Sequence, residues 1–181
     1  MKRFFLVVLA VYFSALSLSA QPDFGAGDKL VGFSIGLGGY YGDNIYSSVN
    51  RLPLIALYYE QCFIGELFDE NSSLGFGGMV GYTQAKWKNN WKTSTTIIGF
   101  RAALHYSFVD NLDCYAGLMI GYNIYKHTFY NNFSGVGPDK NNEIIPAGFI
   151  GARYYFKRDL AVFAELGYGA SNLNIGLAKK F

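Results

Sequence analysis

Apolar and polar side chains alternate along eight stretches of this chain, and that period of two restricts the fold more than any other feature. Successive side chains of a β-strand point to opposite faces, so the pattern predicts strands with one apolar and one polar face. Beyond residue 20, no stretch longer than about ten residues carries the spacing of three or four that marks a helix. The eight expected strands cover residues 30–41, 54–63, 74–87, 95–108, 112–125, 145–156, 160–168 and 173–181.

The connections between these strands differ in length. Residues 109–112 and 157–159 are tight turns, whereas residues 42–51 and 127–142 form long loops. In an up-and-down sheet, successive connections lie at opposite ends. We therefore expect one end of the sheet with short turns and another with long loops.

Residues 1–20 have the composition of a secretory signal peptide. Lys2 and Arg3 precede an uninterrupted apolar run, residues 4–13, and small residues follow up to Ala20. The run is too short for a helical membrane anchor, which takes about 20 apolar residues. We therefore expect cleavage after Ala20, which leaves residues 21–181 as one domain.

The polar face of the strands decides whether the apolar face points inward, in a soluble barrel, or outward into lipid. A soluble barrel would present many Lys and Glu residues to water, but this face is mainly Gly, Ala, Ser, Thr, Asn and Tyr. The lumen of a closed eight-stranded barrel has little room for side chains, which accounts for 22 glycines in 181 residues. The apolar face is nearly free of charge, as expected where Lys or Arg at the bilayer midplane costs about 2–4 kcal/mol. We predict an all-β, eight-stranded, antiparallel up-and-down transmembrane β-barrel.

The leader and the eight strands are followed by a closing segment, GARYYFKRDLAVFAELGYGASNLNIGLAKKF, that ends on Phe181. Together these features resemble the small outer-membrane β-barrel family, similar in architecture to the OmpA transmembrane domain, OmpX and the opacity-type proteins. The resemblance implies a place in the cell outer membrane and a C-terminal strand, ending on an aromatic residue, that the barrel-assembly machinery reads. Lys179 departs from the family pattern, in which an aromatic or apolar residue is usual two places before the end. Relatives of this shape include adhesins, periplasm-tethering barrels, small pores and lipid-modifying enzymes.

Four charged residues have the parity of the polar face and are expected in the lumen, namely Glu60, Arg101, Arg153 and Glu165. Each lies a similar number of residues above the tight turns, so the four can occupy one layer. One hypothesis is a polar gate, in which Glu and Arg pairs open and close a narrow water path. The other is a plug, because buried charges must be paired in a confined lumen, and we favour the plug. The same network would include Tyr58, His105, Asp113 and Tyr115.

Residues 86–92, KWKNNWK, place Trp87 and Trp91 on either side of an Asn-Asn turn with three lysines. Interleaved basic and aromatic residues can bind phosphorylated glycolipid or nucleic acid. Trp at the ends of barrel strands is more simply an aromatic girdle at the bilayer interface, with Lys reaching the headgroups. We interpret the two as girdle residues, which is compatible with lipopolysaccharide contact.

Catalytic and metal chemistry have little support in the sequence. A lipid-modifying enzyme would use His, Ser and an acid near the outer rim, and His127, Ser134 and Glu143 are a set of that type without any spacing that ties them together. The two His and two Cys residues are scattered over different strands, so we expect no metal and no other cofactor. Cys62 and Cys114 fall on opposite faces of strands that are not neighbours, and we expect both thiols to be unpaired.

Charge does not favour a nucleic-acid partner. The chain has 15 basic and 13 acidic residues, and the leader contains two of the basic ones, so the remaining domain is formally neutral. We predict a monomer in contact with outer-membrane lipids and lipopolysaccharide. A non-catalytic structural or surface-interaction role is the leading hypothesis. A narrow, porin-like pore or transporter for small or amphipathic molecules is the alternative, and a lipid-modifying enzyme is the least favoured.

Overall fold

Eight antiparallel strands close into one barrel in the computed structural model, which describes residues 24–39, 49–87, 91–129 and 141–181. The predicted signal peptide, residues 1–20, lies outside the described residues. The strands are β1 (Lys29–Leu37), β2 (Val49–Gly65), β3 (Ser72–Trp87), β4 (Trp91–Val109), β5 (Leu112–Phe129), β6 (Glu143–Lys157), β7 (Leu160–Tyr168) and β8 (Leu173–Lys180). Each strand pairs with the next, and β1 closes the barrel by pairing with β8 from Leu30↔Lys180 to Leu37↔Leu173. The predicted fold class is confirmed.

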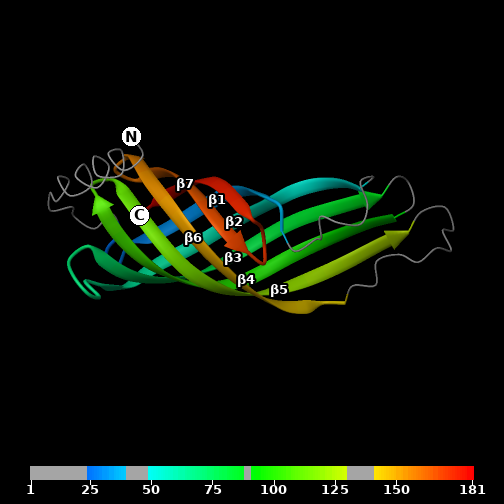
Figure 1. Ribbon diagram of the computed structural model, residues 1–181, viewed down its shortest axis with the longest axis horizontal. Helices are drawn as coiled ribbons and strands as arrows, with labels where there is room; N and C mark the ends of the chain where they lie inside the picture. The colour runs from blue at the N-terminus through cyan, green and yellow to red at the C-terminus, as the bar shows by residue number, and fades with distance from the viewer. Residues whose placement is uncertain (1–23, 40–48, 88–90, 130–140) are drawn as a thin grey trace, which may run out of the picture.

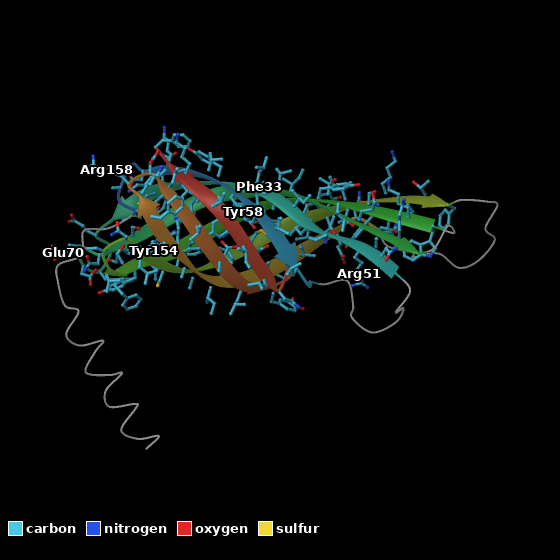
Figure 2. The ribbon with its side chains drawn as sticks, turned by 90° about the horizontal axis from the view of Figure 1, so that it is seen from above. Phe33, Arg51, Tyr58, Glu70, Tyr154 and Arg158 are labelled. Atoms are coloured by element: carbon cyan, nitrogen blue, oxygen red, sulfur yellow. The ribbon has the colours of Figure 1, made fainter. Side chains whose placement is uncertain are left out.

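Alternate residues along the strands face outward, and most of these are apolar. Phe33, Phe100 and Leu118 are 44, 60 and 72% exposed, although they lie in the middle of regular strands. Phe33 can be found on the outer surface in Figure 2. The intervening residues are buried in the lumen, so the apolar face surrounds the barrel as the sequence predicts for a protein in lipid. Within the described ranges, no helix is long and apolar enough to cross a membrane.

The two ends of the barrel differ. One, called the turn end, carries the short connections 66–71, 110–111 and 158–159, the start of β1 and the end of β8 (Figure 1). Glu70 and Arg158 mark this end in Figure 2. Asn111 adopts the left-handed conformation (φ 66°), which Asn tolerates better than most residues, and a bulge between Ser107 and Val109 lies beside this tight turn. The opposite end, called the loop end, carries the long connections, as expected.

Strands β2 to β5 continue farther toward the loop end than β1, β7 and β8 (Figure 1). They contain 17, 16, 19 and 18 residues, against 9 in β1 and 8 in β8. We call the added parts the extension: residues 49–53, 83–87, 91–95 and 124–129. The sequence analysis began β2 and β4 too late and ended β5 too early, because polar residues occur on both faces of the extension and the alternation is lost there.

Small residues in the lumen let neighbouring elements approach closely. A Cβ atom added at Gly77 would collide with the carbonyl oxygen of Tyr59 on the paired strand. One added at Gly176 would collide with the carbonyl oxygen of Phe33 and with the ring of Phe163. Glycine therefore makes room for the few large inward side chains, which is the packing rule expected of a narrow barrel.

Candidate functional site

The lumen holds the four charged residues that the sequence analysis placed there. Glu60 comes from β2, Arg101 from β4, Arg153 from β6 and Glu165 from β7, and each is between 3 and 7% exposed. They share one face because each stands at an inward position of its strand, where the residues two places before and after are buried or half-buried. Four strands on different sides of the barrel thus direct ionic groups to one level.

Arg101 and Glu165 form one half of this cluster. The Arg101 guanidinium donates to Glu165 with an Nη2 to Oε1 distance of 2.5 Å. Its carbon Cζ lies 4.5 Å from the ring centre of Tyr58 and 4.0 Å from that of Phe149, so the cation rests on two aromatic faces. The Tyr115 hydroxyl also donates to Glu165 over 3.1 Å.

Arg153 organises the second half by binding two carboxylates. Its Nη1 donates to Asp113 Oδ2 over 3.0 Å, and its Nη2 donates to Glu60 Oε2 over 3.1 Å. Its guanidinium carbon also lies 4.9 Å from the ring centre of Tyr115. Tyr115 therefore contacts both halves, which makes the whole arrangement one continuous network that we call the charge cluster.

His105 lies between the same two carboxylates. Its Nδ1 is 3.0 Å from both oxygens of Asp113, and its Nε2 is 2.9 Å from Glu60 Oε1. Ionised carboxylates only accept hydrogen bonds, so both ring nitrogens must donate, which is the imidazolium form. Two arginines and His105 then face Glu60, Asp113 and Glu165 with equal and opposite charge. A neutral total satisfies the requirement that buried charges be compensated.

The described side chains of the charge cluster pack closely around a small cavity. A cavity of about 10 Å³ remains among Tyr58, Glu60, Arg101 and their neighbours, and a single water molecule needs roughly 10–15 Å³. A larger hollow of about 280 Å³ lies at the loop end, lined among others by Gly36, Leu54 and Thr95. The lumen is therefore a vestibule above a filled section.

The girdle interpretation of the Trp pair stays a prediction. Trp91 has the parity of the buried residues Thr93 and Thr95, on the side of the sheet that continues the lumen. The side chain of Trp87 lies outside the described residues. Outward aromatic residues near the two ends of the apolar face suit the girdle better, since they are exposed at both levels: Tyr82, Tyr122 and Tyr168 toward the loop end, and Phe63, Phe108, Tyr154, Phe156 and Phe181 toward the turn end.

The residues considered for lipid-modifying chemistry have separate partners. His127 Nδ1 lies 2.9 Å from the hydroxyl of Thr93, while Glu143 accepts a 2.5 Å hydrogen bond from Tyr125. Ser134 lies outside the described residues. Among the described residues, no group of three or more His, Cys, Asp or Glu side chains is arranged to hold a metal ion.

The two cysteines are unpaired, as predicted. Cys62 is buried and points into the lumen near the turn end, whereas Cys114 is half-buried on the outward face.

One inward group was missed by the sequence analysis: Phe24, which precedes β1 and is 1% exposed. A single aromatic residue in the Gly-rich stretch FGAG was its only signal, because it belongs to no alternating pattern.

Breaking the Arg101–Glu165 pair should destabilise the barrel much more than breaking an exposed pair. Arg101→Ala leaves the buried Glu165 carboxylate without its main cation, and such a loss costs about 3–5 kcal/mol. Lys179→Ala is the matched control, because its 3.9 Å pair with Asp159 is about half exposed and exposed pairs contribute about 0–1 kcal/mol. Reversible urea unfolding in lipid vesicles measures both, and equal free energies of unfolding would contradict this expectation.

The architecture is similar to that of solved outer-membrane barrels. The outer membrane protein OprG from Pseudomonas aeruginosa matches with a TM-score of 0.58 and 12% identity, over 90% of this chain and 99% of that chain. Ail, the attachment invasion locus protein of Yersinia pestis, gives 0.55 and 13% over 86% and 99%. The N-terminal β-barrel domain of Pseudomonas aeruginosa OprF gives 0.51 and 12% over 87% and 99%. No protein-family model and no curated protein sequence matches the chain. This protein has the fold of the small eight-stranded outer-membrane β-barrels, whose place is the outer membrane.

Proposed function

We propose that this outer-membrane barrel has a non-catalytic structural or surface-interaction role and does not conduct solutes. The observation that carries the proposal is the charge cluster, which occupies one level of the lumen around a cavity of about 10 Å³. Each of its charges has a partner of opposite sign, so water gains little by entering. The work of the protein then falls to its outer surface and its loop end.

The pore alternative makes an opposite prediction for electrical conductance. In planar lipid bilayers, the refolded protein should produce no stepwise currents, because the charge cluster closes the lumen. Glu60→Ala should introduce small currents, because it removes one carboxylate from the closure and leaves Arg153 and His105 with a partner fewer. Lys157→Ala, at the exposed turn end, is the control and should stay silent. Regular current steps from the unmodified protein would reject the closed-lumen proposal in favour of a pore.

Three lysines of the extension support a lipopolysaccharide partner. Lys86 of β3 is directly opposite Lys92 of β4. Lys126 of β5 is opposite Ser94, which follows Lys92 by two residues on β4. All three have the outward parity of their strands. Like charges directly opposite each other destabilise a sheet, and a bound anion would remove that cost. Phosphate groups of lipopolysaccharide, beside the barrel in the outer leaflet, are the anions we propose.

Replacing all three lysines with glutamine should weaken binding to lipopolysaccharide at least tenfold. The effect should shrink as salt concentration rises, since exposed charges are screened. Binding of vesicle-reconstituted protein to fluorescent lipopolysaccharide measures it, with Lys157→Gln as the charge-matched control at the turn end. Dephosphorylated lipopolysaccharide should bind the unmodified protein as weakly as it binds the triple variant. If the triple variant and the unmodified protein bind phosphorylated lipopolysaccharide with equal affinity, the proposal of lipopolysaccharide as a partner of these lysines is wrong.

The C-terminal residue supports recognition by the barrel-assembly machinery. The Phe181 backbone N–H donates to the carbonyl of Lys29 over 2.8 Å, so the chain end is tied to the start of β1. The Phe181 ring is 66% exposed and lies at the turn end, available to a partner before insertion. Lys179, the departure from the family pattern, points outward with its Nζ 5.7 Å from the centre of that ring. At this level a lysine can reach the headgroups, which makes it tolerable in lipid.

Deleting Phe181 should reduce the amount of folded protein in the membrane several-fold and change the stability of inserted protein little. The ring makes few contacts inside the barrel, so its loss acts before insertion rather than after it. Phe181→Tyr, which keeps an aromatic end, is the control. Heat-modifiable migration on gels gives the folded amount in cells, and urea unfolding gives the stability. Normal insertion of the deletion variant would contradict an assembly role.

A further inference from the structure

The five residues before β1 fold into the turn end of the lumen, and the last two of them, Gly27 and Asp28, still hydrogen-bond to Cys62 of β2. Gly27 N–H donates to the Cys62 carbonyl over 3.0 Å, and Cys62 N–H donates to the Asp28 carbonyl over 2.9 Å. The Ser73 hydroxyl donates to the Phe24 carbonyl over 2.7 Å. We call residues 24–28 the stopper.

The Phe24 ring lies on the inner side of the charge cluster. Its centre is 4.7 Å from that of the His105 ring, and the Arg153 guanidinium carbon is 5.6 Å from it. The face of an aromatic ring attracts cations, so two positive groups favour this position. Gly75 makes room for it, because a Cβ there would come within 3.1 Å of the Phe24 ring and 3.0 Å of Glu60 Oε1. The lumen therefore contains a shaped seat for one aromatic side chain.

The stopper is held by a few bonds of its own. Asp28 closes the turn by accepting a 3.0 Å hydrogen bond from the Gly25 N–H, and it lies 3.3 Å from Lys180. Gly27 has a φ of +90°, which permits the change of direction just before β1 begins at Lys29. The pairs of β1 with β2 and β8 start after this turn. The stopper can therefore leave its seat by breaking its own bonds to Cys62 and Ser73, while the β1 pairs from Lys29 onward remain.

We propose that the inner mouth of the lumen is a binding site for an aromatic group on a cationic surface, and that Phe24 occupies it as a built-in ligand that seals the turn end. The site lies on the turn-end face of the charge cluster, against His105 and Arg153, and it binds an aromatic group instead of closing the lumen, so it goes beyond the proposed function. When Phe24 leaves, the charge cluster becomes accessible to the periplasm. An added aromatic molecule of similar size can take the same seat.

Cys62 provides a native reporter of the seal. Its thiol is buried and donates to the Ile64 carbonyl over 3.5 Å, and its backbone N–H and carbonyl hold Asp28 and Gly27 of the stopper. In a Cys114→Ala background, Cys62 is the single thiol of the mature chain. The rate at which a water-soluble methanethiosulfonate modifies it, in folded protein in detergent, measures how often the turn end opens.

Phe24→Ala should raise the Cys62 modification rate at least tenfold. Phe68→Ala is the matched control, because Phe68 lies at the same end and is 74% exposed, and it should leave the rate unchanged. Indole added to Phe24→Ala should slow the modification again by refilling the seat. Equal rates in the two variants, or no effect of indole, would overturn the proposal.

Heat-modifiable migration shows whether Phe24→Ala folds. If it does not fold, two further variants test the same proposal. Ser73→Ala removes only the hydroxyl that holds the Phe24 carbonyl, and it should raise the rate about threefold. Phe24→Leu loses the aromatic contact with the cations, as Phe24→Ala does, but it fills more of the seat. Its Cys62 modification rate should therefore lie between those of Phe24→Ala and the unmodified protein. Unchanged rates in both would also overturn the proposal. Conductance is recorded in parallel, and its absence in Phe24→Ala would leave the closed charge cluster standing.

Discussion

The hydrogen-bonding demand of the backbone in lipid underlies every other feature of this structure. No water is present in the bilayer core to satisfy a free N–H or C=O group, so an open sheet edge cannot lie there. The pairing of β1 with β8 removes that edge. Closure of only eight strands then fixes a narrow lumen, and the narrow lumen forces small residues opposite large ones. The apolar exterior and the crowded polar interior are both consequences of one closed ring of hydrogen bonds.

Charge in such an interior has to be balanced within the interior itself. The carboxylates of Glu60, Asp113 and Glu165 are matched by Arg101, Arg153 and the doubly hydrogen-bonded His105. A hydrophobic filling could close a barrel equally well, and replacing buried ion pairs with apolar groups is often neutral or stabilising. What the ionic filling adds is a fixed set of directions, since each planar guanidinium donates to carboxylates only at certain angles. The cluster thereby sets the arrangement of four strands that do not all touch.

The alternation of side chains was enough to predict the strand number, the lipid-facing side and the inward position of Arg101 and Glu165. The alternation pattern failed in the extension, where the strands continue beyond the apolar face. Polar residues occur there on both faces, such as Thr93 on the inward face and Lys126 on the outward face. The strand ends and the face on which Trp91 lies could therefore not be predicted from the sequence. Phe24 was missed for another reason: its position depends on contacts with residues 49 and more places away along the chain. Parity describes a strand, and it contains no information about a segment that folds back on the barrel.

The unequal lengths of the strands make the barrel different on its two sides. Strands β2 to β5 extend beyond the ends of β1, β7 and β8 at the loop end. The sheet therefore reaches farther from the membrane on one side of the barrel than on the other. A protein of this shape has a front and a back within the plane of the membrane, even though its transmembrane part is nearly cylindrical. Neighbours diffusing in the same leaflet would meet the long strands β2 to β5 from one direction and the shorter strands β1, β7 and β8 from the other. The molecule can thus impose an orientation on its lateral surroundings without any contact in the lipid-buried region.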